Sequence, residues 1–139
     1  MRANISVSFS KRQAFNSAIS AIVDVLSKFG VEPLIFVDMY HFGFGEEKQM
    51  MQQAMLDIDR SSLLIAETSD KGIGIGIEVG YAKAKNKPII YLRQSSAAHS
   101  TTTAGISDYQ IVYDDPAHLK KQLQYLLEQE LPVLKLPQA

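Results

Sequence analysis

The sequence predicts an α/β domain in which five parallel strands form one sheet that is covered by helices on both faces. Short apolar runs alternate along the chain with longer stretches whose apolar residues recur at helical spacing, and this alternation is typical of such folds. The chain has 139 residues, which fits one core and leaves no room for a second. We therefore expect a single domain over residues 1–139, without internal repeats.

The five predicted strands are short runs rich in apolar and β-branched residues. They cover residues 4–9, 34–37, 63–66, 88–92 and 109–113. The second and third of these runs are continuously apolar, as expected for parallel strands that helices bury on both faces. The stretches between the strands must then supply the covering layers.

Four helices are predicted, one after each of strands one, two, three and five. Their buried faces are marked by apolar positions at helical spacing: Phe15, Ala18, Ile19, Ile22, Val25, Leu26 and Phe29; Met51, Ala54, Met55 and Ile58; Tyr81 and Ala82; Leu119, Leu123, Leu126 and Leu127. Ser10 followed by Gln13 matches a capping box at the first helix start, and Gly30 suits the left-handed residue after its end. Residues 115–116, Asp-Pro, open the last helix.

Two loops stand out between these elements. Residues 39–45 combine aromatic residues with glycines, and they either fold onto the core or form a lid that stacks on a ligand. Residues 94–107 are polar and rich in hydroxyl groups, and long loops of this kind are commonly mobile or functional. For five strands in this alternation we expect a flavodoxin-like (Rossmann-like) three-layer sandwich with strand order 2-1-3-4-5, whose ligand crevice lies beyond Phe9 and Ala66.

Composition and charge narrow the classes of partner. Fourteen Lys and Arg residues against fifteen Asp and Glu residues give a net charge of −1, so no overall field would hold a nucleic-acid polymer or an anionic membrane. A small-molecule ligand is the better expectation. The absence of cysteine excludes disulfides, thiolate metal sites and cysteine nucleophiles, and it agrees with a reducing compartment, so we expect a cytoplasmic protein. The sequence starts with a strand-like run, which predicts neither a signal peptide nor a membrane span.

Residues 10–12 and 67–78 follow the two strands whose ends meet at the expected crevice. Gly72, Gly74 and Gly76 permit a ligand to approach the backbone closely, and a helix start there offers N–H groups that favour a phosphate or a sugar hydroxyl. Val79 stands where a dinucleotide-binding G-x-G-x-x-G would need its third glycine, and no P-loop sequence occurs. We therefore expect a substrate site without a cofactor.

Carboxylates are the strongest candidates for chemistry. Glu78 lies near the expected helix start, where the dipole would keep its carboxylate ionised, and such a group can act as a nucleophile or stabilise a cationic transition state. The alternative is that Glu78 is a structural partner of the helix dipole, Arg12 an exposed helix residue and Ser10 a cap. The three histidines have no metal-ligand spacing and no serine triad can be assembled, so we expect no metal site.

A family resemblance is carried by residues 63–90. The features are the apolar strand LLIAE, the run GIGIEVGYAKA that contains Glu78, and NKPII before the next strand. Together they resemble the nucleoside 2-deoxyribosyltransferase superfamily, which includes the 2′-deoxynucleoside 5′-phosphate N-hydrolases. The resemblance implies that Glu78, which falls on the family's nucleophile, attacks the anomeric carbon of the sugar.

The loop after the first strand adds a weaker match. Ser10 and Arg12 correspond to a G-S-x-R segment of the hydrolases, with Phe9 in place of the glycine. The resemblance implies that Arg12 holds a 5′-phosphate, together with backbone N–H groups of the glycine turn and hydroxyls of residues 94–107. Gly72 replaces the hydroxyl residue that the hydrolases carry in that turn.

The main departure lies in the helix before the third strand. The family carries an aspartate there that orients the nucleophile, whereas this sequence has Ala54. Asp57 lies three residues later on roughly the same helical face, and it could substitute and protonate the leaving base. Asp38, at the end of the second strand, is a further candidate for contact with a ribose hydroxyl.

The resemblance thus implies an enzyme that cleaves or transfers at the N-glycosidic bond of a (deoxy)nucleoside or its 5′-monophosphate, and it implies a homodimer. The alternative is a nucleotide-binding module that kept the fold and lost catalysis, which Ala54 favours. The sequence leaves open whether the sugar is ribose or deoxyribose, which base is preferred, and whether water or a second base accepts the glycosyl group.

Overall fold

The structure, a computed structural model, describes residues 1–134. Five strands form one parallel sheet: β1 (Arg2–Ser6), β2 (Glu32–Ile35), β3 (Leu63–Glu67), β4 (Ile89–Gln94) and β5 (Tyr109–Tyr113). Their order is β2-β1-β3-β4-β5, which confirms the predicted topology. Ser6 pairs with Ala66, so the carboxyl ends of β1 and β3 lie side by side.

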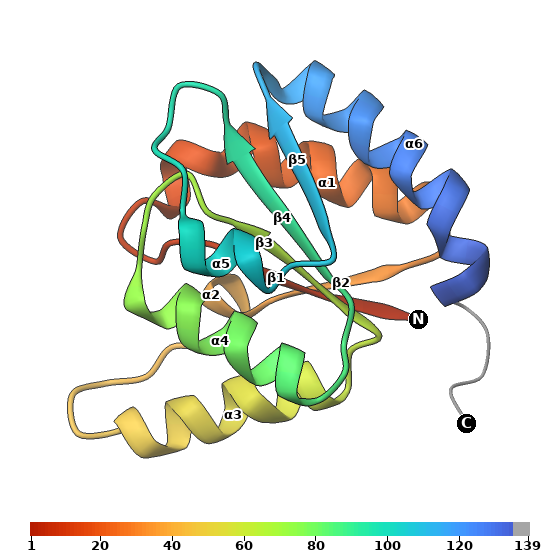
Figure 1. Cartoon of the computed structure of the whole chain (residues 1–139). Helices are drawn as coiled ribbons and strands as arrows, with labels where there is room; N and C mark the ends of the chain where they lie inside the picture. The colour runs from red at the N-terminus through yellow and green to blue at the C-terminus, as the bar shows by residue number, and fades with distance from the viewer. Residues whose placement is uncertain (135–139) are drawn as a thin grey trace.

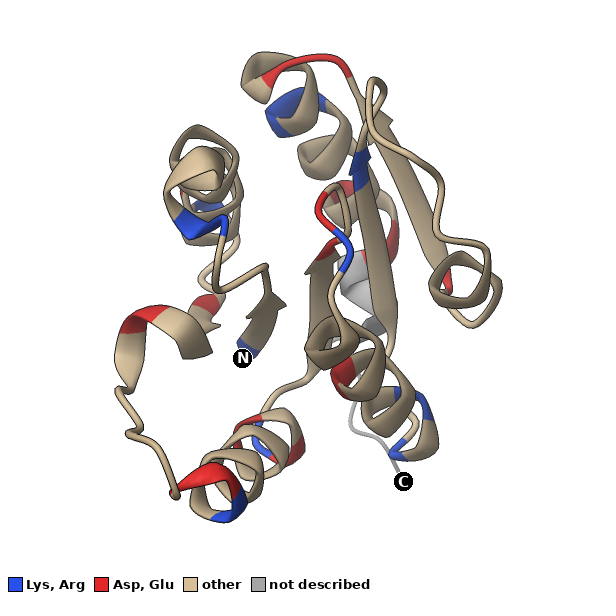
Figure 2. Cartoon of the chain, turned by 90° about the vertical axis from the view of Figure 1, so that its left-hand side faces the viewer, with Lys and Arg blue, Asp and Glu red and all other residues tan. Residues whose placement is uncertain are grey.

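The helices complete a three-layer sandwich. They are the 3-10 turn η1 (Arg12–Phe15), α1 (Asn16–Lys28), α2 (Phe36–Met39), α3 (Glu47–Asp59), α4 (Ile73–Ala84), α5 (Thr101–Gly105) and α6 (Pro116–Leu134). Figure 1 shows α1 and α6 on one face of the sheet and α3, α4 and α5 on the other. Basic and acidic residues are interspersed over the chain in Figure 2, in keeping with the net charge near zero.

Each face of the sheet has its own apolar core. The larger core lies under α1 and α6 and includes Ile5, Ile22, Leu26, Leu119 and Leu123. The smaller core lies under α3 and α4 and includes Ile58, Leu64, Val79 and Ala82. The predicted faces of α1 and α6 therefore pack on the sheet, and of the predicted α3 face Ile58 belongs to the core.

The central strand β1 presents polar side chains to the α3/α4 face. Ile5 and Val7 belong to the α1/α6 core, whereas Asn4, Ser6 and Ser8 are buried on the opposite side. A parallel strand covered by helices is usually apolar on both faces. These buried amide and hydroxyl groups therefore set apart the part of the sheet that faces the candidate site.

The start of the first helix differs from the prediction. β1 ends at Ser6, α1 begins at Asn16, and η1 precedes it with Lys11 as its N-cap, so the predicted capping box of Ser10 is wrong. The side chain of Ser10 instead lies 3.3 Å from the Ser8 hydroxyl. The end of α1 is as predicted, because Gly30 has a φ of +67° and the N–H of Val31 bonds to the carbonyl of Leu26.

Two short helices occupy segments that were predicted as a strand end and a loop. α2 follows β2 directly, and its Phe36 ring lies 5.0 Å from Tyr40 and 6.1 Å from Phe42 between ring centroids. α5 lies within the hydroxyl-rich residues 94–107. Single helical turns are too short to produce a periodic apolar pattern, so the sequence could not indicate them.

Candidate functional site

A cavity of about 360 Å³ lies at the carboxyl ends of β1 and β3, where the crevice was expected. It is lined by residues 7–10 after β1, by Phe36 and Val37 of α2, by Met50, Met51 and Ala54 of α3, and by Asp70, Lys71, Gly72, Gly74, Ile75 and Glu78 of the glycine turn and α4. The residues from α2 and α3 are thus mainly aromatic and sulfur-containing, and the polar groups come from the loop after β1, the glycine turn and α4. An apolar wall facing a few polar groups is typical of a small-molecule site.

Glu78 lies in the polar wall. It is the sixth residue of α4, one turn further along than predicted, so the dipole of the first turn does not govern its charge state. Its Oε2 accepts a hydrogen bond from the Ser6 hydroxyl at 2.9 Å, and Asn4 Nδ2 lies 3.5 Å from that hydroxyl. Burial raises the pKa of Glu78, and hydrogen bonding by Ser6 and Asn4 lowers it in part.

A second carboxylate, Asp70, lines the same cavity. The Ser8 hydroxyl donates to Asp70 Oδ2 at 2.5 Å and accepts the backbone N–H of Lys11 at 3.3 Å. Because the single proton of Ser8 is used on Asp70, the hydroxyl of Ser10, 3.3 Å away, is the donor to Ser8. Ser10 therefore lines the cavity, as do Ser8 and Asp70, which were not candidates from the sequence.

The glycine turn contributes two of its three predicted residues to the cavity. Gly72 and Gly74 line it, whereas Gly76 lies within α4, outside the lining. Gly72 is extended, with a φ of −145°, so the turn does not depend on a left-handed backbone. A Cβ atom on Gly74 would lie 4.0 Å from Glu78 Oε1, so the glycine keeps the space in front of that oxygen open.

Arg12 and Asp38 bind each other and do not line the cavity. Arg12 Nε and Nη2 each donate to Asp38 at 2.8 Å, and Nη1 donates to Asn16 Oδ1 at 2.8 Å. Each of the three guanidinium nitrogens thus donates one hydrogen bond within the protein. The pair ties η1 to α2, whose Phe36 forms part of the cavity wall.

Asp57 lies outside the cavity, one turn along α3 from Ala54. It is 4% exposed, and its Oδ1 accepts hydrogen bonds from Gln53 at 2.9 Å and from the Tyr40 hydroxyl at 3.2 Å. Its Oδ2 is buried and has no hydrogen-bond partner among the described residues. Burial and the bond to Asp57 raise the pKa of Tyr40.

A buried network that sequence analysis did not assign holds the start of the glycine turn. Glu67 is fully buried, and it accepts the backbone N–H of Ser69 at 2.6 Å and the hydroxyl of Tyr113 at 2.5 Å. Burial raises the pKa of both Glu67 and Tyr113. The Ser69 hydroxyl in turn accepts the N–H of Gln94 at 2.8 Å, so the ends of β3, β4 and β5 are joined directly before Asp70.

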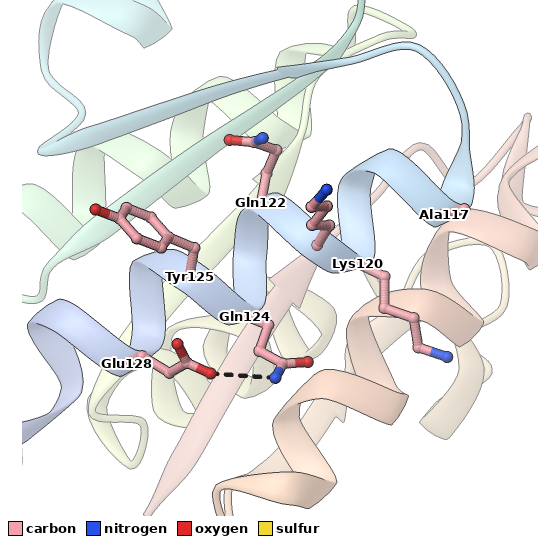
Figure 3. Close-up of a pocket in the computed structure, with 7 residues that line it drawn as sticks. Ala117, Lys120, Gln122, Gln124, Tyr125 and Glu128 are labelled. Carbon is pink, nitrogen blue, oxygen red and sulfur yellow. Dashed lines mark hydrogen bonds between the residues drawn. The ribbon is translucent and has the colours of Figure 1, made fainter.

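Of two further hollows, one adjoins the cavity and the other lies apart from it. A small pocket of about 40 Å³ adjoins the cavity and is lined by hydroxyls of Thr68, Ser100 and Thr103, together with Asp70 and Lys71. A surface hollow of about 690 Å³ lies along α6, where Figure 3 shows the labelled side chains spread along one helix, with Gln124 bonded to Glu128 at 3.1 Å. Only the small pocket shares residues with the cavity, so the α6 hollow is not part of the candidate site.

Within residues 1–134, no group of three or more His, Cys, Asp or Glu side chains is placed to hold a metal ion. None of the helices in that part of the chain is both long and apolar enough to span a bilayer.

Comparison with known proteins gives structural matches only. No family model and no curated protein sequence matches the chain. The CMP N-glycosidase BcmB of Clostridium botulinum is similar at 21% identity and a TM-score of 0.70, over 91% of this chain and 100% of that one. A 2-deoxyribosyltransferase of Bacillus psychrosaccharolyticus is similar at 12% identity and a TM-score of 0.68, over 86% and 90%.

A conserved protein of Enterococcus faecalis V583 is similar at 12% identity and a TM-score of 0.76, over 94% of this chain and 98% of that one. At such identities the likeness shows the fold alone, and the fold shared with these proteins is the flavodoxin-like one that was expected.

Proposed function

We propose that this protein cleaves or transfers at the N-glycosidic bond of a nucleoside or its 5′-monophosphate, with Glu78 as the nucleophile. The observation that carries the proposal is the position of Glu78 in the wall of the cavity between β1 and β3, with one carboxylate oxygen held by Ser6. The activities named for two similar structures, an N-glycosidase and a deoxyribosyltransferase, support the same reaction class.

In the proposed mechanism Oε2 of Glu78 stays bonded to Ser6 while Oε1, which faces Gly74, attacks the anomeric carbon. The new C–O bond forms as the C–N bond breaks, and the electron pair of the C–N bond goes to the leaving base, which takes a proton from water. The result is a glycosyl ester, reached through an oxocarbenium-like transition state. Water or a second base then attacks the same carbon and releases the Glu78 carboxylate.

The environment of Glu78 suits this role. Its pKa is raised chiefly by burial, and a more basic carboxylate is the better nucleophile once it is ionised. The bond from Ser6 fixes the carboxylate orientation, so little reorganisation is needed at the moment of attack. Phe36 and the Met50 and Met51 side chains line the same cavity and offer an apolar surface on which a base can stack.

The remaining predicted residues take different parts in this proposal. Ser10, Gly72 and Gly74 line the cavity and are proposed to contact the substrate. Asp57 is proposed as a positioning residue that acts through Tyr40 and Gln53, since its carboxylate does not line the cavity. Arg12 and Asp38 are proposed to fix the wall that contains Phe36.

We also propose a homodimer that covers the outer face of α4. Ile73 is 86% exposed and Ile77, one turn later on the same helical face, is 50% exposed, so two large apolar side chains adjoin each other at the surface. A second copy would remove both side chains from water. Sedimentation of the Ile73→Lys, Ile77→Lys double variant should give a monomer where the parent gives a dimer, and an unchanged mass would exclude this face.

The proposal is tested with a panel of nucleosides and nucleoside 5′-monophosphates, with free base monitored by chromatography. We expect base release by the parent and a fall of about a thousandfold or more in Glu78→Gln. Glu128→Gln makes the same change on the exposed face of α6 and should leave the rate unaltered. Ala54 in the cavity wall favours a binding module as the second candidate, which would bind ligands and release no base.

A further inference from the structure

We infer that Asp70 determines the substrate class: its carboxylate accepts a hydrogen bond from a sugar hydroxyl, and the site takes unphosphorylated nucleosides in preference to their 5′-monophosphates. The inference rests on the proposed function for the identity of the ligand, and it adds a residue that the catalytic proposal does not use.

The first support is the way Asp70 is held. It is half-buried in the cavity wall, and Ser8 donates to its Oδ2 at 2.5 Å across the crevice between the ends of β1 and β3. No partner for Oδ1 is found within residues 1–134. A carboxylate is an acceptor only, so this oxygen is fitted to a donor such as a hydroxyl group and not to a phosphate oxygen.

The second support is the rigidity of the turn that carries Asp70. Glu67, fully buried at the end of β3, accepts the N–H of Ser69 at 2.6 Å, and the Ser69 side chain is tied to Gln94. Ser8 is itself bonded by the backbone of Lys11. The backbone that carries Asp70 is therefore fixed, and turning its carboxylate away from an incoming phosphate would break its hydrogen bond to Ser8.

The third support is the balance of charge. The charged groups that line the cavity are the carboxylates of Asp70 and Glu78 and the ammonium of Lys71. Two more cations lie near the loop after β1: Arg12 is engaged by Asp38 and Asn16, and Lys11 is exposed, and neither of them lines the cavity. One ammonium against two carboxylates leaves no surplus positive charge for a phosphate dianion, whereas a nucleoside is neutral.

The fourth support is where Asp70 stands between the two hollows. It lines both the main cavity and the small pocket whose hydroxyls come from Thr68, Ser100 and Thr103. A phosphate that used those hydroxyls would lie against the Asp70 carboxylate, and like charges at such range repel. A sugar hydroxymethyl group can donate to Asp70 there and accept from the Thr103 hydroxyl, because the protons of Thr68 and Ser100 are used on the Leu92 carbonyl and on Thr103.

The test separates binding from turnover by using the Glu78→Gln variant as the parent. Calorimetry would measure the affinity of 2′-deoxynucleosides, ribonucleosides and their 5′-monophosphates, with and without Asp70→Asn. We expect each nucleoside that binds to have an affinity about tenfold or more higher than that of its monophosphate. A difference of this size is expected because the nucleoside gains a hydrogen bond to a charged acceptor and avoids the repulsion between phosphate and carboxylate. Asp70→Asn should lower that ratio about tenfold or more, and Asp24→Asn on α1, an equal charge change far from the cavity, should not alter it.

Asp70→Ser serves as a second variant, in case the amide disturbs the turn, and it should shift the preference further toward monophosphates. Tighter binding of monophosphates by the Glu78→Gln parent, or a ratio unchanged in both Asp70 variants, would overturn the inference. Base release from monophosphates alone would leave the proposed function standing and end this inference. A preference for nucleosides that depends on Asp70, without base release by wild type, would support this inference and refute the proposed function. If none of the ligands binds, both the inference and the proposed function are refuted.

Discussion

A methyl group at Gly74 should separate stability from activity in this protein. Gly74 is the second residue of α4, and replacing a helical glycine with alanine stabilises a protein by up to about 1 kcal/mol, or about 2–4 °C in melting temperature. The new Cβ would lie 4.0 Å from Glu78 Oε1, which is ordinary contact and causes no clash. It would, however, occupy space through which the anomeric carbon must approach that oxygen to about 3–3.5 Å.

We therefore expect Gly74→Ala to melt at or above the wild-type temperature and to lose at least about tenfold in kcat, with Gly74→Leu inactive. Gly76→Ala is the matched control, because a Cβ there meets no atom within 4 Å and Gly76 does not line the cavity. It should gain similar stability at full activity. The assays are thermal unfolding and base release on the same preparations. Full activity in Gly74→Leu would refute the proposed direction of attack.

Three further predictions concern the charges around the cavity. Burial raises the folded-state pKa of Glu78 above its ordinary value of 4.5, so the stability that its protonated form contributes is present below pH 4.5 and is lost as the pH rises through the raised pKa. Glu78→Gln should therefore have a higher melting temperature than wild type at pH 8, and an equal melting temperature would count against a buried carboxyl group. Ser6→Ala removes a donor from the Glu78 carboxylate, so it should move the acid limb of the kcat profile to higher pH and lower kcat about tenfold; an unmoved limb would mean that the bond is absent in solution. A double-mutant cycle on Arg12 and Asp38 should give a coupling free energy of about 0.5–1 kcal/mol, with equal changes in affinity for nucleoside and monophosphate, whereas a loss confined to monophosphates would place Arg12 on the phosphate.

The fold was predictable because its signals are local and repeated. The runs at 63–66 and 109–113 are bounded by polar residues and are separated by helical periodicity, and right-handed crossovers then leave few possible strand orders. The position of the crevice followed from that order. Gly30 was predictable for the same local reason, since the chain reverses there with a left-handed backbone.

The contacts within the site were less predictable because they depend on pairs distant in sequence. Arg12 carries a charge that suits a phosphate, and only the fold reveals that Asp38 lies against it. Asp57 shares a helical face with Ala54, yet one turn of helix carries it beyond the cavity. In each case the residue type suits the expected role, and only the fold shows which neighbours the side chain has.

One signal in the sequence could have identified more of the site. Asn4, Ser6 and Ser8 alternate with apolar residues in a strand that the topology places at the centre of a parallel sheet, where both faces are normally apolar. The alternation predicts that polar side chains on one face of this strand make hydrogen bonds to neighbouring residues. Ser6 and Ser8 are the residues that hold Glu78 and Asp70.

The most direct test of the central claim is the mass of the enzyme during turnover. Wild-type protein is mixed with a nucleoside or monophosphate that it cleaves, quenched in acid within the first turnover, digested and analysed by peptide mass spectrometry. We expect one glycosyl group in ester linkage on Glu78, which is lost on incubation with water or an acceptor base. Base release at an undiminished rate by Glu78→Gln, without any glycosylated peptide in either protein, would contradict it.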